Sequence, residues 1–364
     1  MRKVNSMQRL RVTPGSRAYD LHVGADLLPR LAELASGLRL GKRLGLISHP
    51  SLLQPYAEVA AASLRRAGHE VSLLSVPEGE ASKSLDEVAR LSRALVRERL
   101  DRGSALIGLG GGVIGDLAGF VAAVLYRGVP FINVPTTLLA QVDSSVGGKT
   151  GVNIPEGKNL LGAFHQPALV VADVGTLRTL PDREFRSGMA EVVKHGMIAD
   201  PELFRTLEAQ APQILARDPA VLEEIVARSC AIKARVVEGD EREAGRRAML
   251  NFGHTVGHAI EAALGYGRVT HGEAVAHGML VAAALSVRRG LCPDADAVRL
   301  RRLLERYQLL GVPVPPPETL ESYMVSDKKV RDGVLQFVLT HGVGSVSFAP
   351  ISDPNELRVA LQSV

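Results

Sequence analysis

The sequence predicts an α/β fold built as two domains, and three observations support this prediction. The chain has 364 residues, 46% of them hydrophobic, so it can bury more apolar side chain than one compact core usually holds. In the first half, short apolar runs alternate with longer helical patterns, which is typical of a parallel sheet with crossover helices. Beyond about residue 175, helical periodicity predominates. We therefore expect a sheet-containing domain followed by a helical one.

The expected elements can be placed along the chain from these patterns. The apolar runs that predict the strands of the parallel sheet are 43–48, 70–76, 105–109, 131–134 and 168–172. In the second half, helical periodicity is clearest over residues 220–237, 271–289 and 297–309. The proline-rich stretch 313–317 predicts a stiff connection, and no internal repeat is visible.

The composition favours a soluble, cytoplasmic protein without a nucleic-acid partner. Its two cysteines, Cys230 and Cys292, provide neither a disulfide framework nor a CxxC pair, which indicates a reducing compartment. The basic N-terminus has no apolar run behind it, so we expect neither a signal peptide nor a membrane span. The net charge is +4, but only 4% of residues are aromatic and no Lys/Arg tract stands out. A site for an anionic small molecule explains the basic excess better than nucleic-acid binding.

A glycine cluster follows the predicted strand at 105–109. Gly110, Gly112 and Gly115 match G-x-G-x-x-G, a context in which backbone N–H groups can approach a pyrophosphate. The acidic residue that the dinucleotide pattern places about 20 positions later is missing. A plain tight turn, with Asp116 capping the following helix, is therefore an equally good interpretation.

A second glycine-rich segment contains Gly148, Lys149 and Thr150. It differs from the P-loop, because the first glycine of G-x-x-x-x-G-K-[ST] would fall at Asp143, so hydrolysis of a nucleoside triphosphate is disfavoured. Lys149 and Lys158 still suit a phosphate or a carboxylate, since lysine presents a compact charge with rotatable donors. Solvated surface lysines are the alternative interpretation.

One carboxylate and several histidines in the second half indicate a divalent metal site and hence an enzyme. Glu191 is followed later by His254, His258 and His271, and zinc accepts imidazole and carboxylate ligands. His254 and His258 lie four residues apart, so on a helix both could bind one metal ion. The residue after His254 is threonine, so the H-E-x-x-H pattern of metalloproteases is absent.

Taken together, these segments resemble the 3-dehydroquinate synthases of the sugar phosphate cyclase family over nearly the whole chain. The most specific stretches, in the family's order and spacing, are 110–120, 134–151, 157–167, 187–194 and 249–258. The resemblance implies an N-terminal Rossmann-like nucleotide-binding domain with a parallel sheet at 1–177. It also implies a C-terminal all-helical metal-binding domain at 178–364, with the active site in the cleft between the two.

The resemblance further implies two cofactors, NAD and a divalent metal ion, either zinc or cobalt. The implied metal ligands are Glu191, His254 and His271, which leaves His258 as a catalytic acid/base or a substrate contact. The implied NAD contacts are Glu78, Gly79, Glu80, Ala81, Ser82, Lys83, Gly112, Val113, Ile114, Gly115, Asp116, Thr136, Thr137, Lys149, Lys158, Thr176, Leu177, Arg178 and Thr179.

A sugar phosphate substrate and a second subunit are implied in the same way. The substrate contacts would be Asp143, Lys149, Lys158, Asn159, Lys194, Lys233, Arg247, Asn251, His258 and, in the Asp-Lys-Lys motif, Lys328 and Lys329. Arg127 would reach the phosphate of the substrate in the neighbouring subunit, so we expect a homodimer.

The reaction that the resemblance implies is that of a phosphorus–oxygen lyase in the shikimate pathway of aromatic amino acid biosynthesis. It converts 3-deoxy-D-arabino-heptulosonate 7-phosphate to 3-dehydroquinate and phosphate, with NAD recycled. Cyclases whose substrates lack a carboxylate are disfavoured, because a carboxylate-binding set is present at Lys149, Lys233, Arg247 and Asn251. Aminodehydroquinate synthase keeps that carboxylate and remains an alternative. A metal- and NAD-dependent polyol dehydrogenase is a further alternative, against which the phosphate-facing lysines argue.

Overall fold

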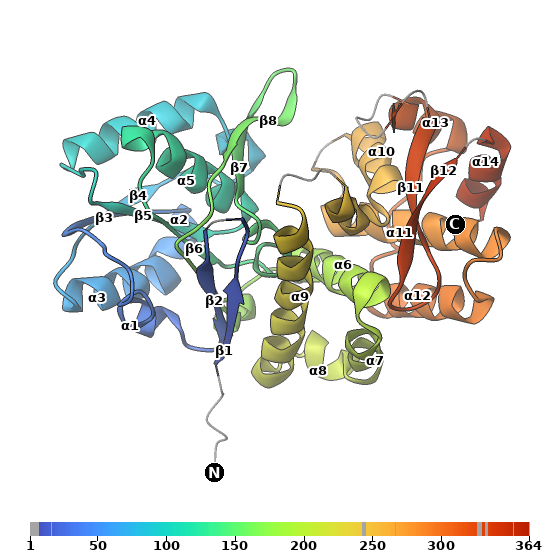
Figure 1. The fold of residues 1–364 in the computed structure, drawn as a ribbon, viewed down its shortest axis with the longest axis horizontal. Coiled ribbons are helices and arrows are strands. Elements are labelled where there is room, and N and C mark those ends of the chain that lie inside the picture. Colours follow the sequence, from blue (N-terminus) through green and yellow to red (C-terminus); the bar gives the residue numbers. More distant parts are fainter. Residues whose placement is uncertain are drawn as a thin grey trace, which may run out of the picture. The chain divides into compact units, whose positions relative to one another are not determined.

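The structure is a computed structural model, and it describes residues 7–15, 17–241, 245–265, 267–325, 330–331, 334–351 and 353–363. The chain forms two compact units, and Figure 1 labels most of their helices and strands. Unit 1 contains Met1–Leu180 and Leu222–Glu241, and unit 2 contains Pro181–Val221 and Arg242–Val364. The segment Leu222–Glu241 thus groups with the N-terminal part of the chain, whereas the predicted boundary at 177–178 assigns it to the C-terminal domain.

Long-range contacts explain why most of α9 (Pro219–Gly239) belongs to unit 1. The Cys230 thiol lies 3.2 Å from the carbonyl oxygen of Gln141. The Glu238 carboxylate accepts hydrogen bonds from the backbone N–H of Thr13 at 2.7 Å and from its hydroxyl at 2.9 Å. Thr13 and Gln141 are distant from α9 in the sequence, so the helical periodicity of α9 does not indicate which domain the helix packs against.

A seven-stranded sheet in the order β1-β2-β9-β6-β5-β3-β4 forms the centre of unit 1. Its strands are β1 (Gln8–Val12), β2 (Tyr19–Gly24), β3 (Arg43–Ser48), β4 (Glu70–Ser75), β5 (Ala105–Gly110), β6 (Phe131–Pro135) and β9 (Leu169–Asp173). The strands from β2 to β4 are parallel, and β1 pairs antiparallel with β2. The five strands predicted from apolar runs are confirmed as β3, β4, β5, β6 and β9.

Helices cover both faces of this sheet, which is why its strands are apolar without alternation. One core cluster joins sheet residues such as Leu46 and Ile107 to Leu64 of α3 (Glu58–Arg66). The other joins the oppositely directed Ile47 to α4 (Leu85–Arg97) and α5 (Gly112–Val124). Unit 1 also contains two short helices, α1 (Leu31–Leu34) and α2 (Pro50–Leu52), and an antiparallel hairpin formed by β7 (Lys149–Ile154) and β8 (Gly157–Phe164).

The direction in which successive strands are added to the sheet reverses at β3. From β3 the chain moves to β4 on one side, and then returns through α4 to β5 on the other side. In open α/β sheets, ligands bind outside the carboxyl ends of the strands at such a reversal. The helix α5 begins directly after β5 at this point, so its N-terminal N–H groups face the edge where a ligand is expected.

Unit 2 is rich in helices but is not all-helical, so that part of the prediction is wrong. Its helices are α6 (Asp182–Ala199), α7 (Pro201–Ala209), α8 (Ala211–Leu215), α10 (His254–Leu264), α11 (His271–Arg288), α12 (Asp294–Arg306), α13 (Pro317–Val325) and α14 (Pro354–Gln362). A small antiparallel sheet is formed by β10 (Val330–Arg331), β11 (Val334–Thr340) and β12 (Val346–Ile351). Alternate residues Phe337 and Leu339 enter the helical core with Ile351, which is the period of two that marks a strand.

No helix among the described residues is both long enough and apolar enough to cross a membrane.

Candidate metal and cofactor site

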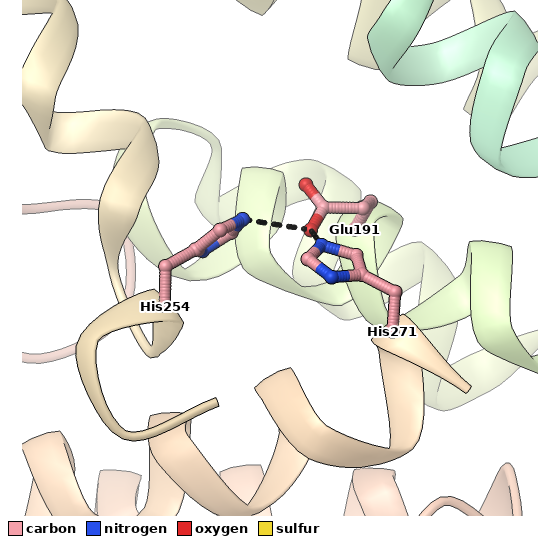
Figure 2. A group of neighbouring side chains, drawn as sticks. All are labelled: Glu191, His254 and His271. Carbon is pink, nitrogen blue, oxygen red and sulfur yellow. Dashed lines mark ion pairs between the residues drawn. The ribbon is translucent and has the colours of Figure 1, made fainter. Parts of the chain in front are cut away.

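Three helices of unit 2 each present one side chain to a common point. Glu191 lies in the middle of α6, and His254 and His271 are the first residues of α10 and α11. Figure 2 shows both imidazoles facing the same carboxylate oxygen. His254 Nε2 lies 3.5 Å from Glu191 Oε1, and His271 Nε2 lies 3.6 Å from it. The structure therefore brings together the three residues that the resemblance implies as metal ligands.

These distances suit a shared metal ion better than direct hydrogen bonds. An N–H···O bond spans about 2.7–3.2 Å. Tetrahedral ligands with bonds of roughly 2.1 Å to zinc lie about 3.4 Å apart. The Glu191 side chain is fully buried, and its Oε1 has no hydrogen-bond donor among the described residues. A buried carboxylate oxygen in that condition is costly unless a cation compensates it, so the donor set fits a divalent metal.

The charges around this point keep Glu191 in the form that a metal requires. Lys194, one turn further along α6, forms an ion pair with Glu191 Oε2, and its side chain is 1% exposed. Burial opposes ionisation, but the surrounding positive charge, above all the Lys194 ammonium, holds the pKa of Glu191 well below its usual range. Metal ligands must be deprotonated, and a carboxylate with this pKa is ionised at neutral pH.

The two histidines have opposite pKa shifts. Burial lowers the pKa of His254 well below its usual value, so its imidazole is neutral and can act as a ligand. For His271, burial also lowers the pKa, but the neighbouring carboxylates of Glu191 and Glu261 outweigh that effect and raise the pKa to about 10. The protonated His271 ring lies between two carboxylates, Glu191 and Glu261. A divalent cation bound by His271 would replace the proton on the side of Glu191.

A close approach of α10 and α11 places His254 beside His271. Gly253 precedes α10 in the left-handed region at φ 79°, which favours glycine. A Cβ on Gly278 of α11 would lie 1.9 Å from the Gly253 carbonyl oxygen, so only glycine permits this backbone contact. The two imidazole rings are consequently 5.2 Å apart between centroids.

A second close contact places α11 against α6. The backbone N–H of Gly272 donates to Ser187 Oγ at 3.0 Å, and a Cβ on Gly272 would lie 2.1 Å from the Ser187 carbonyl oxygen. Next to this contact, Arg183 of α6 forms two hydrogen bonds with the Glu273 carboxylate, at 3.1 and 2.8 Å. Ser187 lies one turn before Glu191, so the contact places the carboxylate against the start of α11.

His258 lies on α10 one turn after His254, as the spacing predicts for a helix, but its side chain is exposed. The structure groups His254 with Glu191 and His271, whereas His258 groups with Glu261 and His271. The pairing of His254 with His258 on one metal, which spacing alone suggests, is therefore not the arrangement found.

Glu261 is a contact of the site that the sequence reasoning missed. Its Oε2 lies 3.1 Å from His271 Nδ1. The only sequence signal for it is its position seven residues after His254, two turns along the same helix face. That signal cannot indicate a contact with His271, which lies on another helix.

The other predicted substrate residues of unit 2 lie close to these helices in the sequence. Arg247 and Asn251 belong to the 3-10 helix Arg246–Asn251 that precedes α10; Arg247 is buried and Asn251 is half-buried. Lys328 and Lys329 lie outside the described residues.

In unit 1, the predicted NAD contacts follow the carboxyl ends of four parallel strands. Residues 78–83 follow β4, residues 112–116 follow β5, Thr136 and Thr137 follow β6, and residues 176–179 follow β9. Because these strands are parallel, all four segments lie at one edge of the sheet. Apart from Lys149 and Lys158, which lie on the hairpin of β7 and β8, the residues that the resemblance implies as NAD contacts thus lie at the edge where an α/β fold binds its ligand.

A buried lysine joins two of these segments. Lys83 Nζ donates to Asp116 Oδ2 at 2.5 Å and also contacts the side-chain oxygen of Asn159. Asp116 therefore pairs with Lys83, and α5 begins at Gly111 without a side-chain cap, which disfavours the interpretation of Asp116 as a helix cap. Burial raises the pKa of Asp116, although Lys83 acts in the opposite direction.

The predicted substrate residues of unit 1 lie on a one-turn helix, the hairpin and α9. Lys233 of α9 forms an ion pair with Asp143, which lies on the π-helical turn Ala140–Ser144. Lys149 begins β7, and Lys158 and Asn159 lie near the start of β8, where all three side chains are exposed.

Arg127 ends the 3-10 helix Leu125–Arg127, and its side chain is exposed. Its φ is 68° and that of Tyr126 is 52°, a left-handed pair that is uncommon for such residues. The Tyr126 hydroxyl donates to the carbonyl oxygen of Leu100 at 2.7 Å, which fixes the neighbouring backbone.

Comparison with known proteins gives one family. Family models for the N-terminal and C-terminal parts of 3-dehydroquinate synthase match residues 73–187 and 188–330. The chain is 50% identical over 357 residues to the 3-dehydroquinate synthase of Symbiobacterium thermophilum, covering 96% of this chain and 99% of that protein. It is 48% identical to the one of Pelobacter propionicus, covering 93% of this chain and 94% of that protein.

Solved structures of sugar phosphate cyclases are similar over almost their whole length. A 2-deoxy-scyllo-inosose synthase complexed with carbaglucose-6-phosphate, NAD+ and Co2+ has a TM-score of 0.89 at 27% identity, covering 98% of this chain and all of that chain. The 2-epi-5-epi-valiolone synthase of Streptomyces hygroscopicus, with NAD+ and Zn2+ bound, has a TM-score of 0.87 at 29% identity, covering 96% and 98%. Both family models match this chain, and the two named 3-dehydroquinate synthases are 50% and 48% identical to it. The chain therefore belongs to the 3-dehydroquinate synthase family.

Proposed function

We propose that this protein is a 3-dehydroquinate synthase that converts 3-deoxy-D-arabino-heptulosonate 7-phosphate to 3-dehydroquinate and phosphate, with catalytic NAD and a divalent metal ion. The observation that carries the proposal is the convergence of Glu191, His254 and His271 on one point, in a chain that is 50% identical to a named 3-dehydroquinate synthase. The relatives solved with NAD+ and with Co2+ or Zn2+ support both cofactors.

We assign the metal to Glu191, His254 and His271, and NAD to the segments that follow β4, β5, β6 and β9. When bound, the metal ion polarises the C5 hydroxyl of the substrate and NAD accepts its hydride and later returns it. Both zinc and cobalt accept this set of ligands. Lys194 contributes by holding the Glu191 carboxylate ionised inside the protein.

The reaction has no net redox change, and each of its steps needs charge or proton handling. Oxidation at C5 gives a ketone that acidifies the C6 proton, and phosphate then leaves from C7 by elimination. After reduction at C5, the ring opens and an intramolecular aldol reaction closes the carbocycle. We assign phosphate and carboxylate binding to Lys149, Lys158, Lys233 and Arg247, since fixed cations stabilise the charge of a leaving phosphate.

Proton handling is assigned to Asp143, Asn251 and His258. The Lys233 ammonium neutralises Asp143 and fixes its position, because it binds both the side chain and the backbone carbonyl oxygen of that residue. His258 places an imidazole within 6.0 Å of the His271 ring, between centroids, so a proton acceptor lies next to the proposed ligands.

The decisive experiment incubates the metal-loaded protein with the heptulosonate phosphate and substoichiometric NAD. Phosphate, NADH and dehydroquinate are followed together. We expect equal amounts of phosphate and dehydroquinate over many turnovers, with no build-up of NADH. Stoichiometric NADH from a polyol would instead identify a dehydrogenase. Turnover of an amino analogue in place of the heptulosonate phosphate would identify aminodehydroquinate synthase.

We also propose that the protein is a homodimer in which Arg127 contacts the substrate phosphate of the partner subunit. The exposed guanidinium on a backbone fixed by Tyr126 supports this assignment. Arg127→Ala should lower kcat/KM by about 10- to 100-fold, because hydrogen bonds to charged groups contribute roughly 1.5–3 kcal/mol.

Mixing two variants that are each impaired in turnover tests whether Arg127 acts across the interface. Arg127→Ala and His271→Ala chains, unfolded and refolded together, should recover about one quarter of wild-type turnover, since half of the dimers are mixed and each has one intact site. If Arg127 acts within its own subunit, every site in the mixture lacks one of the two residues and no activity returns.

A further inference from the structure

Glu261 makes a contact that none of the assigned roles uses. It lies on the third turn of α10, and its Oε2 is 3.1 Å from Nδ1 of His271. The Glu261 side chain is 15% exposed and that of His271 is 26% exposed, so the pair is largely shielded from water. A hydrogen bond to a charged acceptor in such a place is stronger than one at the surface.

The two nitrogens of the His271 ring have different partners. Nδ1 points to Glu261, and Nε2 lies 3.6 Å from Glu191 Oε1, at the proposed metal position. An ionised carboxylate can only accept a hydrogen bond, so the contact with Glu261 places a proton on Nδ1. A neutral imidazole with its proton on Nδ1 has its lone pair on Nε2, which is the nitrogen that faces Glu191.

The two ring nitrogens of His254 have the same kinds of partner as those of His271. The arrangement of His271 is therefore repeated in the second histidine. In His254, Nδ1 is 3.2 Å from the carbonyl oxygen of Phe252, and Nε2 is 3.5 Å from Glu191 Oε1. Both rings therefore have an acceptor behind Nδ1 and the shared carboxylate in front of Nε2. For His254 the acceptor is backbone, but for His271 it is a side chain that can be changed.

We propose that Glu261 is a positioning residue that fixes the tautomer and ring orientation of His271, so that Nε2 is directed at the divalent metal ion. This inference rests on the proposed metal site at Glu191, His254 and His271. Hydrogen-bonded carboxylates behind metal-binding histidines raise the basicity of the ligand, and their loss typically weakens metal binding by about 10- to 100-fold.

The same group of side chains allows a second role for Glu261, which the experiment must distinguish from the first. His258, Glu261 and His271 also form a group whose ligand atoms lie within 4.8 Å of one another. A cation in that group would make Glu261 a metal ligand itself. The proposed role requires one metal ion per subunit, whereas the other arrangement requires two.

The test measures the affinity and stoichiometry of Zn2+ and Co2+ on the purified full-length protein after removal of metal, by competition with a chelator. The variants are Glu261→Ala, Glu261→Leu and Glu261→Gln. We expect one ion per subunit throughout, with affinity reduced about 10- to 100-fold in the first two variants. In Glu261→Gln the amide oxygen can still accept from Nδ1, so the loss should be at most a few-fold. The visible absorption of bound Co2+ should shift in the alanine variant and return towards wild type in the glutamine variant.

Glu356→Gln is a matched control within unit 2. Its carboxylate is bound by Arg289 at 2.6 and 2.8 Å and is 18% exposed, close to the exposure of Glu261. This control should leave metal affinity unchanged, even if it lowers the unfolding temperature. His271→Ala, in contrast, should lose tight metal binding.

The outcomes separate the inference from the site on which it rests. Wild-type affinity in Glu261→Ala, with metal binding lost in His271→Ala, would overturn the role of Glu261 and leave the metal site standing. Two ions in the wild type and one in Glu261→Ala would make Glu261 a ligand and also overturn the positioning role. If the wild type binds neither metal, the proposed metal site fails and the inference fails with it.

Discussion

Glu191→Gln is expected to reduce turnover by more than about 100-fold and to lower the stability of the metal-free protein. The substitution keeps the volume of the side chain but removes the charge that faces His254 and His271. Loss of residues that only support a metal ligand costs about 10- to 100-fold in affinity or activity, so loss of a ligand should cost more. Metal content, metal affinity and turnover would be measured on the same preparations.

The stability effect has a separate cause, which is Lys194. Its side chain is 1% exposed, and its ammonium is paired with Glu191 Oε2. Removal of one member of a buried ion pair costs roughly 3–5 kcal/mol, because the other charge stays buried without compensation. Denaturant unfolding in the presence of a chelator would measure this loss without a contribution from bound metal.

A double variant separates the two effects. Glu191→Gln combined with Lys194→Met removes both charges, and replacing a buried pair with uncharged groups of similar volume is often neutral for stability. We expect it to recover most of the stability of the apoprotein but none of the metal binding. Full metal affinity in either variant would remove Glu191 from the set of ligands.

Local sequence patterns were sufficient for five of the seven strands in the sheet of unit 1, and β1 and β2 were not among them. The central strands β5 and β6 are buried on both faces, so they appear in the sequence as mainly apolar runs at 105–109 and 131–134. The hairpin of β7 and β8 was not predicted; most β8 side chains are exposed, so its apolar residues do not mark a buried face of a core strand. The strand β11 was also not predicted; its sequence does not alternate between apolar and polar residues, and Phe337, Val338, Leu339 and Thr340 are all buried. It is a single short segment that follows a long series of helices, so the surrounding sequence of the C-terminal half shows mainly helical periodicity.

The candidate metal set shows what local patterns cannot provide. Spacing pairs His254 with His258, because residues four apart share a helix face. The ring that lies opposite Glu191 together with His254 is instead His271, from the start of another helix. Tertiary contacts decide this arrangement, and only the family resemblance pointed to Glu191, His254 and His271 as one group. Neither source indicated Glu261, whose role depends on a contact between α10 and α11.

Gly278→Ala should have the largest effect on the fold of unit 2, because the contact that joins α10 and α11 has no space for a methyl group. A Cβ there would lie 1.9 Å from the Gly253 carbonyl oxygen and 3.0 Å from the backbone nitrogen of Gly257. The obstructing atoms are backbone, so no side-chain rotation can relieve the overlap and the helices must separate. Overpacking of a core costs about 1–3 kcal/mol and sometimes more, and we expect a loss at or above the upper end of that range.

The same substitution should weaken metal binding, because His254 and His271 are the first residues of the two helices that must separate. Unfolding in denaturant and Zn2+ affinity would both be measured. Gly311→Ala is the matched control in unit 2, since a Cβ on Gly311 would meet nothing within 4 Å, and it should change stability by less than about 0.5 kcal/mol. If Gly278→Ala matched this control in both measurements, the close contact of α10 with α11 would not be what holds the two histidines together. The metal position would then have to be fixed mainly by the contact of Ser187 with Gly272.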